Sequence, residues 1–154
     1  MFVEDDDFYH PQFLAETVRR LEGVELVGGI WQPYYNVNHR VWKLFRNRGS
    51  CLCQTGMHAT LVPLFLRVLD FCEQRATYGV DGNFWKQAKE MGCKTQEYEE
   101  MYVVGIKGIE GQPGLGVGHR PKPGWAHDPQ MVKLKEWVGA DWPAYAGFYC
   151  GGRA

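Results

Sequence analysis

The chain has 154 residues, a formal net charge of −1 and 45% hydrophobic residues, and 23% of its residues are charged. A chain of this length can bury a core without disulfides, and its composition excludes an intrinsically disordered protein. The near-zero net charge argues against a general attraction to nucleic acid.

No targeting or membrane segment is predicted. The stretch that follows Met1 is acidic, and no apolar run is long enough to span a bilayer. The five cysteines are odd in number and lack the spacing of a disulfide framework, so we expect reduced thiols. The expectation is a soluble cytoplasmic protein that does not associate with membranes.

The first predicted helix covers residues 11–22. Pro11 suits the first helical position, and Gly23 supplies the end of the helix. The apolar residues that we expect to face the core recur at helical spacing: Leu14, Val18 and Leu21.

Residues 24–48 are rich in β-forming side chains and predict two antiparallel strands. The strands are expected to turn near residues 32–37 and to close at 47–50. Gly28 and Gly29 interrupt the first apolar run, which indicates a bulge or an edge position.

The clearest helix is predicted over residues 60–75, with Thr60 as its N-cap. One continuous apolar stripe runs along it, formed by Leu61, Leu64, Phe65, Val68, Leu69 and Cys72. A helix with such a stripe is typical of the centre of a core.

Shorter elements follow in the second half of the chain. A third helix is predicted from an Asp81 cap to Gly92, with Trp85 and Ala88 facing inward. A helical turn is predicted at 95–100 and a strand at 101–107. A further helix is predicted to begin at Asp128 and to end at Gly139, with Met131, Leu134 and Val138 facing inward. A short strand is predicted near the C-terminus. Together these elements predict a single α+β domain over residues 1–154, in which a small, mostly antiparallel sheet of three to five strands packs against the helix 60–75.

The segment 108–129 is the first candidate functional feature. It holds six glycines and four prolines in 22 residues, together with His119 and His127. Long segments without regular structure are uncommon in compact domains, and they usually carry function. We expect this Gly/Pro loop to border the principal pocket or partner surface and to expose at least one of its histidines. Trp125 is expected to anchor the loop and is a further candidate partner-binding residue.

The second candidate feature is a basic and aromatic strand. It carries four cations without an acidic neighbour, and its candidate partner-binding residues are Arg40, Trp42, Lys43, Arg46 and Arg48. Alternation along a strand would send the even-numbered residues from 40 to 48 to one face. Guanidinium groups beside an aromatic ring can bind an acidic protein surface or nucleic acid. The alternative is a half-exposed sheet face whose guanidinium groups remain in water.

The cysteines support a third hypothesis. Cys51 and Cys53, followed by His58, have zinc-binding chemistry, but the sequence lacks a second ligand pair, so no metal or cofactor is predicted. Either cysteine could instead act as a nucleophile, because both precede the helix 60–75. The catalytic residues would then be Cys51 or Cys53, a base from His119 or His127, and Asp128 or Asp141 to orient that base.

These features lead to two functional hypotheses. The first is a non-catalytic binding protein that engages a macromolecular partner through the basic strand and the Gly/Pro loop, with a protein favoured over nucleic acid. The alternative is a small cysteine-dependent hydrolase or transferase. We rank binding first, because the sequence shows no complete catalytic constellation.

Overall fold

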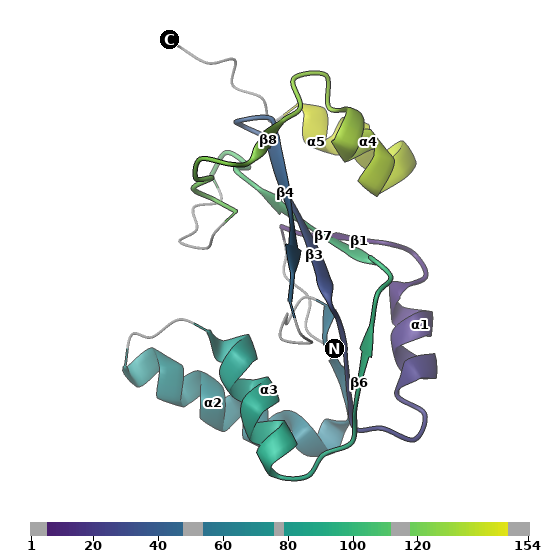
Figure 1. Ribbon diagram of the computed structural model, residues 1–154, viewed down its shortest axis with the longest axis vertical. Coiled ribbons are helices and arrows are strands. Elements are labelled where there is room, and N and C mark those ends of the chain that lie inside the picture. The colour runs from purple at the N-terminus through teal and green to yellow at the C-terminus, as the bar shows by residue number, and fades with distance from the viewer. Residues whose placement is uncertain (1–5, 48–53, 76–78, 112–117, 148–154) are drawn as a thin grey trace. The chain divides into compact units, whose positions relative to one another are not determined.

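The computed structural model describes residues 6–47, 54–75, 79–111 and 118–147 (Figure 1). The fold is α+β, as the sequence predicts. In the described residues the strands form two mixed sheets, of five and of three strands, where a single mostly antiparallel sheet was expected.

The described chain divides into two compact units. Unit 1 contains residues 11–31 and 46–100, and unit 2 contains residues 6–10, 32–45 and 101–147, apart from the gaps given above. The single-domain organisation over residues 1–154 stays a prediction.

The sheet of unit 1 has β2 (Leu26–Gly29) at its centre, with β5 (Gly56–Met57) antiparallel and β6 (Thr95–Tyr98) parallel to it. The helical turn expected at 95–100 is wrong, because backbone pairing with the buried β2 overrides the polar sequence of β6. A Cβ atom on Gly28 would lie 2.6 Å from the Trp85 ring, so this glycine permits close packing instead of marking a bulge.

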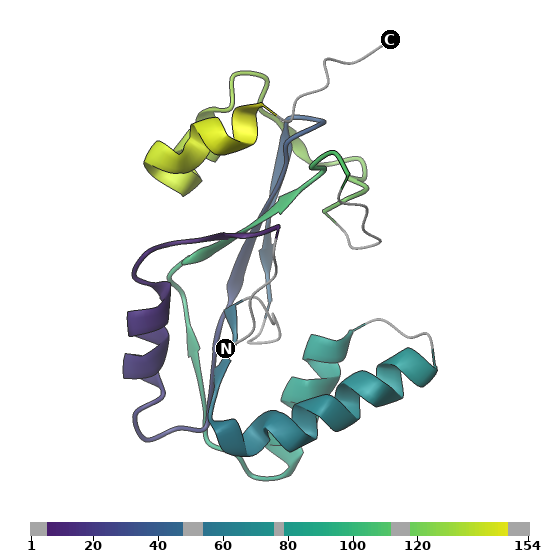
Figure 2. The ribbon, with the colours of Figure 1, turned by 180° about the vertical axis from the view of Figure 1, so that it is seen from behind.

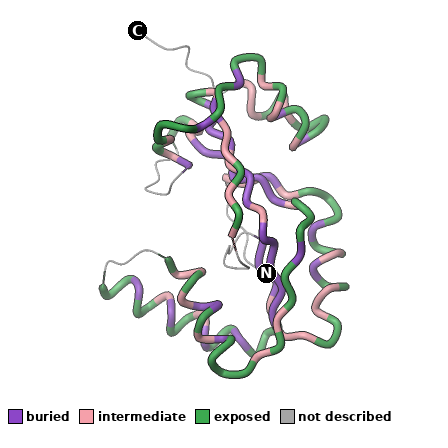
Figure 3. The backbone as a smooth tube through the Cα atoms, viewed as in Figure 1, coloured by how far each residue is buried: buried purple, intermediate pink, exposed green. Residues whose placement is uncertain are grey.

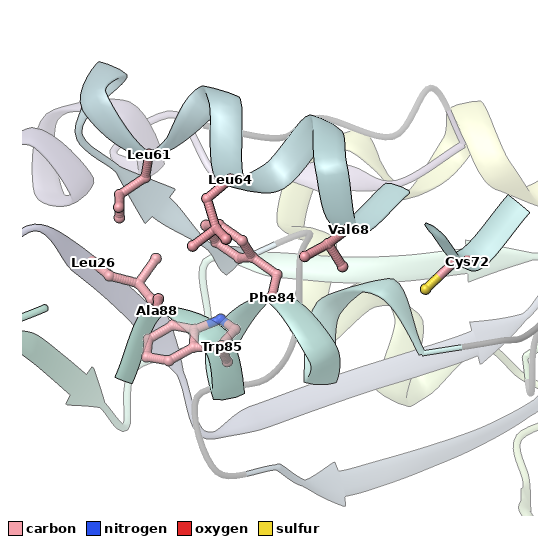
Figure 4. Close-up of a cluster of buried hydrophobic side chains, with 8 residues drawn as sticks. All are labelled: Leu26, Leu61, Leu64, Val68, Cys72, Phe84, Trp85 and Ala88. Atoms are coloured by element: carbon pink, nitrogen blue, oxygen red, sulfur yellow. The ribbon is translucent and has the colours of Figure 1, made fainter. Parts of the chain in front are cut away.

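The core of unit 1 lies between β2 and the paired helices α2 (Val62–Gln74) and α3 (Val80–Glu90) (Figure 4). The predicted central helix and its stripe are confirmed. A 3-10 turn, η2 (Ala59–Leu61), precedes α2, so Thr60 is not the N-cap. The buried cluster consists of Leu26, Leu61, Leu64, Val68, Cys72, Phe84, Trp85 and Ala88. Asp81 is also not a cap, because α3 begins after Gly79, whose φ of +94° favours glycine, and Asp81 lies in the first turn.

Helix α1 (Phe13–Arg20) turns a different face inward from the one predicted. Phe13 and Thr17 are buried, whereas Leu14 and Val18 are 58% and 60% exposed. Both sets have helical spacing, and the larger apolar surface of Phe13 favours its burial. Arg20 reinforces this rotation, because its guanidinium lies over the Tyr98 ring and 2.9 Å from Glu100.

The sheet of unit 2 has the order β1-β7-β3-β4-β8. Its strands are β1 (Phe8–Tyr9), β7 (Val103–Lys107), β3 (Trp31–Asn36), β4 (Val41–Arg46) and β8 (Ala126–His127). β3 runs parallel to β7, while β1–β7 and β4–β8 are antiparallel pairs. Residues 24–48 form three strands, β2, β3 and β4, where two were predicted. The turn of the β3–β4 hairpin lies at 37–40 instead of 32–37.

Two helices accompany this sheet, and Figures 1 and 2 show them side by side: α4 (Val132–Val138) and α5 (Trp142–Ala146), joined by the 3-10 turn η3 (Gly139–Asp141). The predicted helix after Asp128 is confirmed. Part of the segment in which a C-terminal strand was predicted, residues 142–146, is helical, and its last residues, 148–154, lie outside the described residues. Leu134 and Val138 are buried with residues of β1, β3 and β7 in a second core cluster, and the tube in Figure 3 shows these strands as largely buried.

Within the described ranges, the helices are too short or too polar to cross a membrane.

Candidate functional site

A pocket of about 590 Å³ lies in unit 2 between the 37–40 turn and residues 119–127 of the Gly/Pro loop. This volume is within the range of sites that enclose a small ligand or a few side chains. The described part of the loop therefore borders a pocket, and its place at the principal pocket or partner surface stays a prediction. His119 and His127 both line the pocket, and His127 is exposed, as expected.

Backbone pairing holds the two walls of the pocket together. The antiparallel pair β4–β8 places Val41 opposite His127 and Trp42 opposite Ala126. Next to this pair, the amide of Asp128 donates to the carbonyl of Arg40 at 2.8 Å, and the Arg40 guanidinium donates to the carbonyl of Pro129 at 2.6 Å. Two segments more than 80 residues apart therefore form one surface.

Asn36 supports both walls from beneath and is completely buried. Its Nδ2 donates to the carbonyl of Gly118 at 2.9 Å, and its Oδ1 accepts from the amide of His39 at 2.9 Å. A single amide side chain thus fixes the start of the loop segment and the tip of the β3–β4 turn.

The lining of the pocket has an apolar floor and a basic rim. Val41 and Trp125 are the buried residues of the floor, at 5% and 8% exposure. Phe45 packs against Trp125 with ring centroids 6.1 Å apart, which confirms Trp125 as an anchor of the loop. The rim is formed by exposed side chains: His39, Arg120, Lys122 and His127. Of the described residues that line the pocket, none carries a carboxylate.

His119 connects this pocket to a buried ionic cluster. Its Nε2 lies 3.7 Å from Oδ2 of Asp6. The ammonium of Lys107, which is 5% exposed, contacts Asp6 at 2.9 Å and Asp7 at 2.7 Å.

Asp128, the residue predicted to orient a catalytic base, is engaged in structural hydrogen bonds. Its carboxylate oxygens accept the amides of Val132 and Lys133, each at 2.8 Å, at the start of α4. Oδ2 also accepts from the Tyr35 hydroxyl at 3.2 Å. Burial, and then the charge of Asp128, raise the pKa of Tyr35 well above its usual range, so the phenol remains a donor.

The other half of the catalytic hypothesis falls outside the described residues, because Cys51 and Cys53 do. The pairing of either cysteine with His119 or His127 therefore stays a prediction. Among the histidine, cysteine, aspartate and glutamate side chains that the structure does describe, no group of three is placed to hold a metal ion.

The predicted partner-binding residues of the basic strand do not share one face. Trp42 packs edge-on against Trp137 of α4 at 5.4 Å, and Lys133 lies over its ring. The opposite, odd-numbered face of β4 meets the loop, because Val41 lines the pocket and Lys43 lies over Phe45, which contacts Trp125.

The remaining cations of this strand belong elsewhere. Arg40 has a left-handed φ of 49° in the turn, which breaks the expected alternation at its first residue. Arg46 groups with unit 1, where its guanidinium lies over Trp31 at 5.5 Å, and Arg48 lies outside the described residues.

The sequence-based hypothesis did not include three residues that line the pocket, His39, Arg120 and Lys122, or Asn36, which holds the turn and the loop. Two signals were present. The run Asn-Val-Asn-His-Arg at 36–40 has the composition of a turn, and the run His-Arg-Pro-Lys-Pro at 119–123 alternates basic residues with prolines. Neither signal indicates that the two runs meet.

Comparisons of this chain with protein-family models, with curated proteins and with solved structures gave no match.

Proposed function

We propose that this chain is a non-catalytic binding protein that engages an acidic surface of a partner protein through unit 2. The binding surface consists of the pocket and two adjoining residues, Arg40 of the 37–40 turn and Lys43 of β4. The β4–β8 pairing carries the proposal, because it brings the basic strand and the Gly/Pro loop, two features far apart in sequence, into one surface.

Charge supports an acidic partner. The rim residues Arg120 and Lys122 are exposed, and the lining described above is free of carboxylates. Positive charge on one side of an interface and negative charge on the other speeds encounter and selects the partner.

The aromatic residues favour a protein over nucleic acid. Recognition of single strands uses exposed ring faces on which bases stack. Trp125 is only 8% exposed, and Trp42 packs against Trp137, so neither indole offers an open face for stacking. An apolar floor beneath charged residues is instead typical of a protein interface, which has an apolar core and a polar rim.

The test compares two charge-reversed proteins that differ only in where the charges lie. The first carries Lys43→Glu, Arg120→Glu and Lys122→Glu in unit 2. The matched control carries Arg67→Glu, Lys86→Glu and Lys94→Glu, all at exposed positions of unit 1. Partners are captured by crosslinking to each protein, identified by mass spectrometry, and purified for titration.

The proposal expects a purified partner whose affinity falls by about a hundredfold with the unit 2 variant and by less than about threefold with the control. The affinity of the wild-type protein should also fall as salt is added, because ions screen exposed charges. Equal affinities of the two variants for every captured partner would contradict the proposal.

A further inference from the structure

We infer that the pocket beside Trp125 binds an extended acidic peptide segment that inserts one large apolar side chain. This inference rests on the proposed function and specifies the chemistry of the partner at that surface. Three independent properties of the pocket lead to it: its two-zone lining, its charge and its position at the edge of a sheet.

The two-zone lining requires an amphipathic ligand. Val41 and Trp125 present apolar surface at the bottom of the pocket, and Pro121 and Pro123 add further apolar surface from the loop. A purely ionic ligand would leave this surface in contact with water, and a purely apolar ligand would bury the rim cations without a counter-charge. A side chain such as phenylalanine or leucine, flanked by carboxylates, satisfies both zones.

The rim determines the sign of the flanking charges. Arg120 and Lys122 stand two residues apart on the loop, with His39 and His127 on the wall formed by the turn and β8. His119 lines the same side of the pocket, with its Nε2 3.7 Å from Oδ2 of Asp6. Carboxylates of a ligand would therefore find two cations on the loop and imidazole N–H donors on the other wall.

The position at a sheet edge favours an extended peptide over a compact ligand. In the described residues, β8 is the last strand of the five-stranded sheet and pairs only with β4. Both of its residues, Ala126 and His127, are exposed. Edge strands recruit extended peptides through backbone hydrogen bonds, while a neighbouring pocket selects a side chain. Here the pocket borders the edge strand directly, since His127 belongs to both.

The test uses a fluorescein-labelled octapeptide with one phenylalanine flanked on both sides by aspartates, measured by fluorescence anisotropy with the full chain. Two matched peptides replace either the phenylalanine by serine or every aspartate by asparagine. Two further ligands, inorganic phosphate and an oligothymidylate of similar length, compete with the labelled peptide. The indole N–H signal of Trp125, followed by nuclear magnetic resonance with that of Trp42 as an internal control, reports where the peptide binds.

We expect the phenylalanine–aspartate peptide to bind at least about tenfold more tightly than either matched peptide, with a shift of the Trp125 signal and little change at Trp42. The double variant Arg120→Gln and Lys122→Gln should weaken binding by about tenfold, and the control Lys86→Gln and Lys94→Gln should not. These four side chains are exposed, so the variants are expected to fold normally.

Three results would overturn the inference: equal binding of the matched peptides, stronger binding of the oligothymidylate, or displacement by millimolar phosphate alone. Its failure can be told apart from failure of the proposed function. If a partner protein binds in a way that depends on the unit 2 charges but the peptide does not bind, only the inference about the pocket is contradicted. If the peptide binds at Trp125 but no partner protein is found whose affinity depends on the unit 2 charges, the proposed function is contradicted.

Discussion

The Tyr35 hydroxyl lies 3.2 Å from Oδ2 of Asp128, although 93 positions separate the two residues in the sequence. The same carboxylate accepts the amides of Val132 and Lys133 at the start of α4. One acidic side chain thus joins the C-terminal end of β3 to the beginning of α4. Asp128 directly follows β8, the strand that forms a wall of the pocket.

Removing this carboxylate should destabilise unit 2. Asp128→Ala leaves the amides at the start of α4 without their side-chain acceptor and leaves the Tyr35 hydroxyl only the backbone carbonyl of residue 128, at 3.3 Å, which we expect to lower the free energy of unfolding by about 1–3 kcal/mol. Urea denaturation followed by tryptophan fluorescence measures the loss. Asp128→Asn keeps one acceptor oxygen and should lose less, and a stable Asp128→Ala protein would show that α4 does not need its cap.

The phenol of Tyr35 should make stability depend on alkaline pH. Its pKa is raised above the usual value of 10.0 in the folded protein, mainly by burial. Above pH 10 the unfolded chain loses this proton while the folded chain retains it, so the stabilisation is complete below pH 10 and declines as pH rises. We expect the wild-type protein to lose about 1.4 kcal/mol per pH unit more than Tyr35→Phe in this range. Parallel stability curves for the two proteins would contradict the prediction.

A matched pair of valines tests the packing of unit 1. Val68 on α2 is 1% exposed, and Val18 on α1 is 60% exposed. Val68→Ala should cost about 1.5–3 kcal/mol of unfolding free energy, because it removes buried methyl groups and leaves a cavity. Val18→Ala should change stability by less than about 0.5 kcal/mol, since its methyl groups already contact water. An equal loss of unfolding free energy in both variants would show that Val18, and with it that face of α1, is buried.

Asn36 offers two separable tests of how the pocket is held. Asn36→Asp keeps the acceptor for the His39 amide but removes the donor to Gly118, whereas Asn36→Ala removes both hydrogen bonds. Hydrogen exchange at the His39 amide should therefore accelerate in the alanine variant and less in the aspartate variant. Both variants should bind the acidic peptide more weakly, because each frees the start of the loop segment. An unchanged exchange rate of the His39 amide in the alanine variant would show that the 37–40 turn is stable without the Asn36 side chain.

The two loop histidines should matter more for binding than for folding. His119→Ala combined with His127→Ala is expected to shift the melting temperature by only a few degrees, since His127 is exposed and His119 lies at the pocket wall. Peptide affinity, measured by anisotropy, should fall, because the double variant removes two side chains that line the pocket. A double variant that unfolds yet binds normally per folded molecule would assign both histidines to structure alone.

Local patterns in the sequence were sufficient for the elements with long apolar stripes. Helix α2 was predicted because its stripe repeats over three turns, and α4 because an Asp-Pro start and a glycine end frame it. The predicted buried face of α1 was wrong, because Leu14 and Phe13 lie on two different faces that both have helical spacing. Only the residues that pack against the helix decide which face is buried.

The candidate site required information that no local pattern contains. Ala126 and His127 have little preference for a strand, and they form β8 only because β4 lies beside them. The same pairing decides which face of β4 meets the pocket, so Lys43 turns toward the loop and Trp42 turns away from it. Pairings that span more than 80 residues follow from the folded topology, which the sequence reveals only after both strands are recognised.

The interleaving of the two units has a consequence for the order in which the protein is made. Every described segment of unit 1 has been synthesised once residue 100 leaves the ribosome, whereas β7 and β8 of unit 2 come later. Until then, the two outer edges of the β3–β4 hairpin have no strand to pair with. Unpaired strand edges expose the hairpin to aggregation or to binding by chaperones. Translation speed over the segment after residue 100 would then govern the yield of folded protein, and rare codons placed there would lower it.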